Sequence, residues 1–130
     1  MIEITADIFN EMDPESGSPL LDLILDEAQQ KGTGKWASQN SLNIGAPIPT
    51  LNAAVESRIL SSLKTQRVNA SRLINGPVPA YEGKRQILID AARDALYASK
   101  IMSYAQGLGL LKIASDEYKY DLQINSIAKI

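Results

Sequence analysis

The longest helical pattern in the sequence is "KRQILIDAARDALYASKIMSYAQ", residues 84–106. Apolar side chains recur along it at helical spacing and cover much of its circumference. This pattern predicts a long helix that is buried against several neighbours. Gly107 and Gly109 follow at once and predict a break or a bend, with a separate helix over 110–120.

Shorter helical patterns lie on both sides of this stretch. They cover residues 2–12, 20–31, 36–45, 51–75 and 124–130, with loops at 13–19 and 77–83. Ser18 is expected to cap the second helix, with Pro19 in its first turn, and Thr50 to cap the fourth. No convincing alternating strand is present. The prediction is an all-α fold, a single helical domain over 1–130 with about seven helices. Because the patterns at both ends begin or stop without a cap, we expect this domain to be truncated at both ends.

The composition excludes several classes of function. The chain contains no Cys and no His, so it has no disulfide, no Cys or His metal site and no histidine for proton transfer. Its net charge of -2 is made of well-mixed charges, which argues against nucleic-acid binding. No apolar run approaches the roughly 20 residues of a membrane helix. We therefore expect a cytoplasmic protein with no nucleic-acid or membrane partner.

The segment "QQKGTGKWAS", residues 29–38, is the most distinctive candidate site. It does not match a phosphate loop of the G-x-x-x-x-G-K-[ST] type, because Trp36 follows Lys35. It matches the dinucleotide fingerprint formally, but that motif requires a preceding strand, and here a helix is predicted. Two interpretations stay open from the residues alone. One is a glycine turn that ends a helix and carries solvated lysines. The other is a site for the phosphate of a substrate that is not a nucleotide.

Several segments together resemble the 6-phosphogluconate dehydrogenase family. The segment "ILDEAQQKGTGKWASQNSL" is similar to the family hallmark I-L-D-x-A-x-Q-K-G-T-G-K-W-T, and "GAPIPTLNAAVESRILSSLKTQRVNAS" to the next family segment. "ALYASKIMSYAQGLGLLKIAS" and "IEITADIF" also fit. The resemblance covers nearly the whole chain and implies the middle part of the all-helical C-terminal domain. Ala37 and Glu56 depart from it, since threonine and an aromatic residue are usual there.

The resemblance implies a function for the whole enzyme and a smaller role for this chain. Family members oxidise 6-phosphogluconate with NADP to ribulose 5-phosphate and CO₂ in the pentose phosphate pathway, usually as homodimers. It implies that Lys31, Thr33 and Arg58 bind the phosphate end of the substrate. It places the dinucleotide-binding domain, the acid and base, and the C-terminal tail outside these residues. We therefore expect no catalytic, cofactor-binding or metal-binding residue in this chain, and no activity of the chain alone.

The remaining candidates receive simpler interpretations. Trp36 is expected to pack over the glycine turn, and Tyr97 and Tyr104 to pack in the core. Asp90 and Asp94 lie beside Arg93 and are expected on a solvated face. The alternative function for the chain is a non-catalytic helical interaction module derived from the same fold, in which the long helix over 84–106 contacts a partner.

Overall fold

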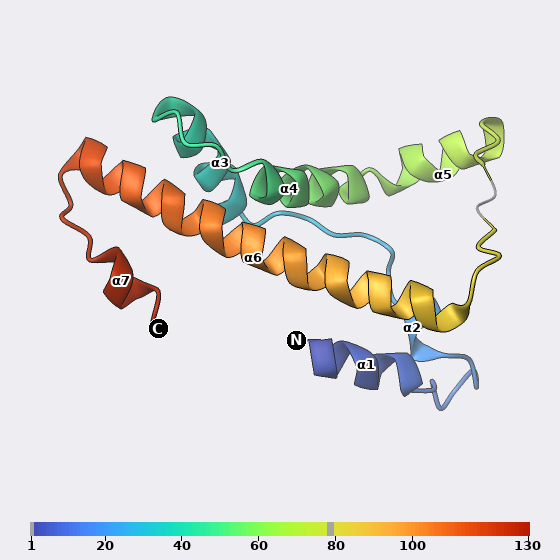
Figure 1. The fold of residues 1–130 in the computed structure, drawn as a ribbon. Coiled ribbons are helices and arrows are strands. Elements are labelled where there is room, and N and C mark those ends of the chain that lie inside the picture. The colour runs from blue at the N-terminus through green and yellow to red at the C-terminus, as the bar shows by residue number, and fades with distance from the viewer. Residues whose placement is uncertain (1, 78–79) are drawn as a thin grey trace.

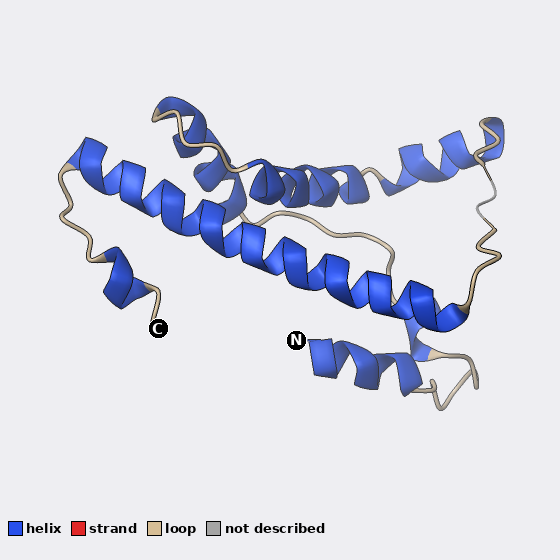
Figure 2. Ribbon diagram, in the orientation of Figure 1, coloured by secondary structure: helices blue, strands red, loops and turns tan. Residues whose placement is uncertain are grey.

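The computed structural model describes residues 2–77 and 80–130 and is built from helices (Figures 1 and 2). Positions 78 and 79 of the loop expected over 77–83 lie outside the described residues. Over the described ranges the elements are α1 (Ile2–Asn10), α2 (Leu20–Leu23), α3 (Thr33–Asn43), α4 (Pro49–Ser62), α5 (Lys64–Leu73), α6 (Arg85–Tyr118) and α7 (Ile124–Ile127). No named strand occurs in these ranges; one isolated bridge joins Met12 and Pro19. The predicted all-α fold is confirmed.

The longest element, α6, runs the length of the molecule as one helix of 34 residues (Figure 1). The predicted break at Gly107 and Gly109 is wrong. A glycine inside a helix costs only about 1 kcal/mol relative to alanine, and it still donates its backbone hydrogen bond. The helix ends at Lys119 instead, in the left-handed conformation with φ 58°. The amide groups of Lys119 and Tyr120 both donate to the Ser115 carbonyl there.

Helices α3 and α4 pack on each other, and α4 also packs on α6. Thr50 and Gln106 exchange two hydrogen bonds of 2.9 Å across the α4–α6 contact. The expected Thr50 cap is wrong, because Pro49 is already helical and Ile48 is the N-cap. Within the described residues, the buried apolar side chains are only Ala46, Ile48 and Ala114. The core is therefore small and lies where α3, α4 and the C-terminal part of α6 meet.

The predicted helix over 20–31 is mostly wrong. Only Leu20–Leu23 is helical, and the backbone becomes extended at Ile24 (ψ 134°). Ser18 does not cap this turn; the N-cap is Pro19 and makes no side-chain hydrogen bond. A short isolated helix is marginal in water unless its apolar face is packed. Leu21, Leu23 and Leu25 stay exposed, so packing does not stabilise a helix. Residues 24–32 instead form a non-helical link to α3, called the connecting segment below.

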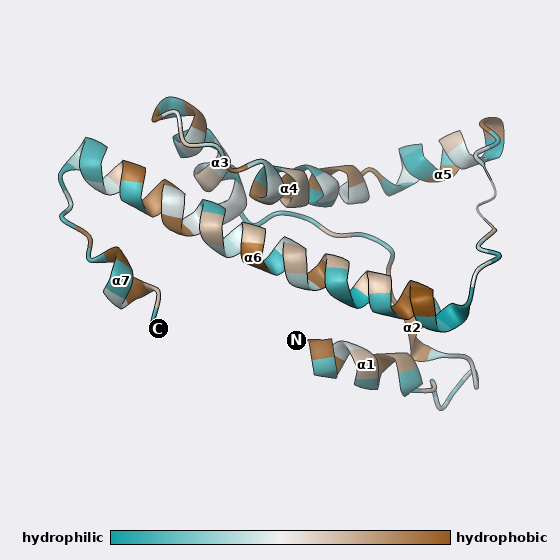
Figure 3. Ribbon diagram, in the orientation of Figure 1, coloured by the Kyte–Doolittle hydropathy of each residue, from teal (hydrophilic) through white to brown (hydrophobic). Residues whose placement is uncertain are grey.

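Much of the apolar surface of α6 has no partner within the described chain. Figure 3 shows hydrophobic residues along the whole helix. Exposed members of the N-terminal two-thirds include Ile87, Leu88, Ile89, Leu96, Ile101 and Met102. The core packing expected for Tyr97 and Tyr104 is wrong for this chain, since they are 67% and 65% exposed. Across residues 2–77 and 80–130, no helix has the length and apolarity needed to cross a membrane.

Candidate functional site

The glycine turn joins the connecting segment to the start of α3. Gly32 adopts φ 112°, a conformation that side chains with a Cβ rarely adopt. Its amide donates to the Oε1 of Gln30 at 3.0 Å, and its carbonyl accepts the Trp36 amide at 2.9 Å. Helix α3 therefore begins at Thr33, earlier than predicted. No side chain caps this N-terminus, so its first backbone N–H groups are available to another acceptor.

Gly34 allows α3 to lie close to α4. A Cβ built at Gly34 would lie 2.7 Å from the Cγ2 methyl of Val55, which is less than any ordinary contact. Valine is stiff about χ1, so this methyl group cannot easily move aside. The two glycines thus have different purposes. Gly32 provides the backbone turn, and Gly34 provides the close approach of the two helices.

Arg58 reaches from α4 to the connecting segment. Its Nε donates to the Gln29 carbonyl at 3.1 Å, and its Nη2 donates to the same oxygen. One residue earlier, the Ala28 amide donates to Ser61 Oγ at 2.9 Å. The Ser61 bond satisfies the Ala28 amide, which a helix over 20–31 would have paired internally, and the Arg58 bonds satisfy the Gln29 carbonyl, which would have had no partner at the end of such a helix. They hold the segment against α4 directly before Lys31.

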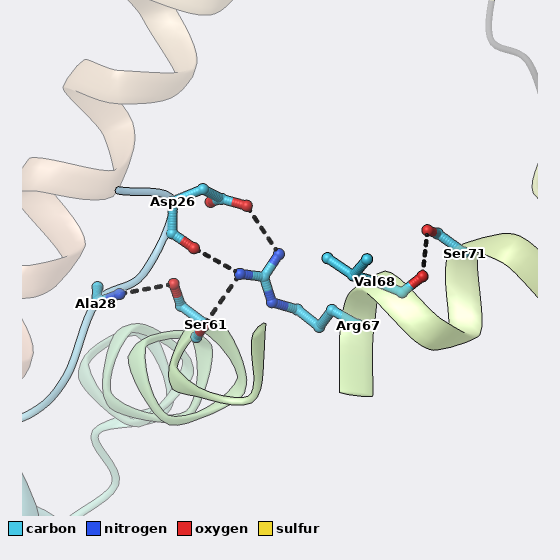
Figure 4. A network of polar contacts seen from close by, with 6 residues as sticks. All are labelled: Asp26, Ala28, Ser61, Arg67, Val68 and Ser71. Carbon is cyan, nitrogen blue, oxygen red and sulfur yellow. Dashed lines mark hydrogen bonds and ion pairs between the residues drawn. The ribbon is translucent and has the colours of Figure 1, made fainter. Parts of the chain in front are cut away.

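A second arginine, Arg67 on α5, fastens the start of the same segment (Figure 4). Its Nη1 forms an ion pair of 3.2 Å with the Asp26 carboxylate. Its Nη2 donates to the carbonyl of Asp26 at 2.8 Å and to that of Ser61 at 3.0 Å. Ser61 therefore contributes its hydroxyl to Ala28 and its carbonyl to Arg67. The sequence did not predict these contacts, because the partners are far apart along the chain. Gln29 lies 29 positions from Arg58, and Asp26 lies 41 positions from Arg67.

Two of the three predicted phosphate-binding residues stand at the turn itself. Lys31 directly precedes Gly32, and Thr33 follows it as the first residue of α3; both side chains are exposed. Arg58 comes from α4 and contacts the segment two residues before Lys31. The structure thus brings Arg58 to the segment that carries Lys31. Within the described residues, the Lys31 ammonium has no ion-pair partner, so its charge is free for an anion.

The other candidate residues lie beside the turn or on α6. The ring of Trp36 lies 3.9 Å from a Cβ built at Gly32, but Trp36 is 66% exposed, so it covers the turn without being buried. Beside the turn, Gln30 and Lys35 line a hollow of about 470 Å³ between α3 and α4. Arg93 pairs with Asp90 and Asp94 at 3.1 Å each, on the solvated face expected. Among the residues that the structure describes, no cluster of acidic side chains could hold a metal ion.

The dinucleotide interpretation of the turn fails for a reason different from the one predicted. The preceding segment, residues 24–32, is neither a helix nor a strand. However, no parallel sheet lies beneath the turn in the described ranges, and a dinucleotide loop needs one. The fold and the turn together define an all-helical domain with a basic glycine turn at the start of a helix.

The chain belongs to the 6-phosphogluconate dehydrogenase family, as its C-terminal domain. The family model with the description "6-phosphogluconate dehydrogenase, C-terminal domain" matches residues 1–130. The chain is 52% identical over its whole length to the NADP(+)-dependent, decarboxylating 6-phosphogluconate dehydrogenase of Bacillus subtilis. It is 53% identical to the decarboxylating enzyme of Synechococcus elongatus. In both comparisons the chain spans 28% of the relative.

A solved structure supports the same assignment. Plasmodium falciparum 6-phosphogluconate dehydrogenase, studied in its apo form, with its cofactor NADP+ and with its substrate 6-phosphogluconate, matches 98% of this chain. The TM-score is 0.88 at 38% sequence identity, and the match covers 28% of that structure. The recognition made from sequence and the predicted type of fold are therefore confirmed.

Proposed function

We propose that this chain forms the substrate-binding and dimerisation part of an NADP-dependent, decarboxylating 6-phosphogluconate dehydrogenase. Within that enzyme it would bind the phosphate end of 6-phosphogluconate. The observation that carries the proposal is the contact of Arg58 with Gln29. It brings a cation from α4 to the segment that leads into the Lys31–Thr33 turn.

The three residues offer complementary chemistry to a phosphate dianion. The Lys31 ammonium provides a compact charge, and the Thr33 hydroxyl donates a hydrogen bond. Two N–H groups of Arg58 already donate to Gln29, but a guanidinium carries five, so three remain for phosphate oxygens. The first amides of α3 add the positive end of a helix dipole. Holding the phosphate, which is remote from the reacting carbons, orients the sugar acid for the reaction.

We assign NADP binding and proton transfer to parts of the enzyme beyond this chain. The relatives named above are more than three times as long, which leaves room for both. A purified sample of this chain should therefore not reduce NADP when 6-phosphogluconate is added. NADPH formation by the chain alone would contradict this part of the proposal. The proposal also includes a homodimer and a cytoplasmic location. The exposed apolar side chains of α6 support the association of subunits.

Titration calorimetry with 6-phosphogluconate tests the phosphate site. Lys31→Ala and Arg58→Lys should each weaken binding about tenfold or more, because each removes charge-assisted hydrogen bonds. Lys100→Ala and Arg85→Lys change exposed cations of α6 and serve as matched controls, with binding unchanged. An equal loss of affinity in the controls would mean that 6-phosphogluconate responds only to the net charge of the chain and not to these two residues. Unchanged binding in Lys31→Ala and Arg58→Lys would refute the assignment.

A second candidate function is a non-catalytic interaction module of the same fold. One observation favours it: the apolar residues of α6 that stay exposed, such as Leu96 and Ile101. This candidate predicts association with a partner and no response to 6-phosphogluconate. Because the phosphate-binding proposal predicts a response at Lys31 and Arg58, the titration above separates the two.

A further inference from the structure

Arg67 lies apart from the glycine turn, yet its guanidinium joins three elements. From α5 it reaches the backbone carbonyl and the carboxylate of Asp26, in the connecting segment, and the carbonyl of Ser61. Ser61 belongs to the last turn of α4, where carbonyls lack a partner inside the helix. A single side chain therefore ties the end of α4 and the start of α5 to the connecting segment (Figure 4).

The energetics of this contact indicate a geometric role. The side chains of Arg67 and Asp26 are 37% and 71% exposed, and ion pairs at such exposure contribute little to stability. The Arg67 Nε is buried and finds no acceptor among the described residues, which costs free energy. The Nη2, by contrast, bridges two backbone carbonyls at 2.8 and 3.0 Å. It fixes the separation of the two backbones, so its main contribution is to position them.

We propose that Arg67 is a positioning residue for the phosphate site. By binding Asp26, it fixes the position of the connecting segment beside α4. That position determines the place from which Lys31 and Thr33 reach the phosphate. The inference rests on the proposed function, and Arg67 itself touches no substrate in this account.

Substitution of Arg67 tests the role. Arg67→Met keeps much of the apolar stem and removes the fork of donors, whereas Arg67→Lys keeps the charge with a single point of contact. At a temperature where circular dichroism shows full helicity, Arg67→Met should bind 6-phosphogluconate about tenfold more weakly. Arg67→Lys should lose less affinity for 6-phosphogluconate than Arg67→Met. The matched control is Arg93→Met, which removes an arginine paired at 3.1 Å with Asp90 and Asp94 on α6 and should bind unchanged.

A double-mutant cycle with Lys31→Ala separates positioning from stability. If Arg67 acts through Lys31, then Arg67→Met should weaken binding little further once Lys31 is already alanine. The same tenfold loss in both backgrounds would overturn the proposal. So would unchanged affinity of Arg67→Met accompanied only by a lower Tm, because that result assigns Arg67 to stability alone.

Amide hydrogen exchange tests the same role without ligand. The Ala28 amide donates to Ser61 Oγ and the Gly32 amide donates to Gln30. Both should exchange faster in Arg67→Met than in the unmodified chain. If the unmodified chain binds no 6-phosphogluconate, the proposed function fails, while faster exchange at these amides still supports the positioning of the segment by Arg67. Exchange that stays unchanged at both amides overturns the inference, whatever the ligand does.

Discussion

At the scale of single residues, the site depends on contacts that only certain side chains allow. Gly34 is the clearest case, because the Val55 methyl group occupies the space that a Cβ would need. We predict that Gly34→Ala lowers the free energy of unfolding by about 1–3 kcal/mol, the usual cost of overpacking. Chemical denaturation followed by circular dichroism measures this change.

The control for Gly34→Ala is a compensating change at Val55. In the Val55→Ala background the methyl group is gone, so Gly34→Ala should cost much less than in the unmodified chain. Equal costs in the two backgrounds would show that the 2.7 Å approach is not what makes glycine necessary at this position.

At the scale of elements, the change from glycine to alanine should have the opposite effect on stability in α6. A Cβ built at Gly107 meets nothing within 4 Å, and the residue lies inside a continuous helix. Gly107→Ala should therefore stabilise the chain by about 0.5–1 kcal/mol, because alanine loses less backbone entropy. Thermal denaturation measures it. Destabilisation by Gly107→Ala would indicate the break in the helix that the sequence predicts and the structure lacks.

The stability of the loop between α1 and α2 should depend on pH. Hydrogen bonds donated by the hydroxyl and the amide of Ser16 hold the pKa of Asp13 below its usual 3.8. Because the folded-state pKa is depressed, this stabilisation is fully present above the ordinary pKa and is lost as the pH falls through the folded value. The amide shift of Ser16 should therefore titrate with a midpoint below 3.8. Asp13→Asn should abolish the titration, and a midpoint at or above 3.8 would contradict it.

The helices were predictable from sequence where the apolar spacing is regular and local. The long pattern over 84–106 and the shorter one over 36–45 both correspond to observed helices, α6 and α3. The connecting segment was not predictable, because its helical pattern is overridden by hydrogen bonds from residues far along the chain. Arg58 was identified through the family resemblance. Its contact with Gln29, and the whole Arg67 network, depend on three-dimensional packing that no spacing reveals.

At the scale of the whole molecule, a small core stands beside a large exposed apolar surface. Side chains such as Leu96 and Met102 are 51% and 56% exposed on α6. Extensive exposed apolar surface is typical of sites where proteins associate. We predict that the chain self-associates as its concentration rises, and that Leu96→Glu reduces this association. Sedimentation velocity measures it, with Ser99→Glu as the control, because this substitution makes the same change of −1 in charge at an exposed polar position of α6. A chain that stays monomeric at all concentrations would contradict the prediction.

The glycine turn is proposed to bind a sugar phosphate. The most direct test is a ¹⁵N NMR titration of the chain with millimolar 6-phosphogluconate, compared with gluconate, which lacks the phosphate. The account predicts that 6-phosphogluconate shifts the backbone amides of Lys31 and Thr33 and the Nε–H of Arg58, and that gluconate leaves them in place. No shift with 6-phosphogluconate, or equal shifts with both compounds, would contradict it.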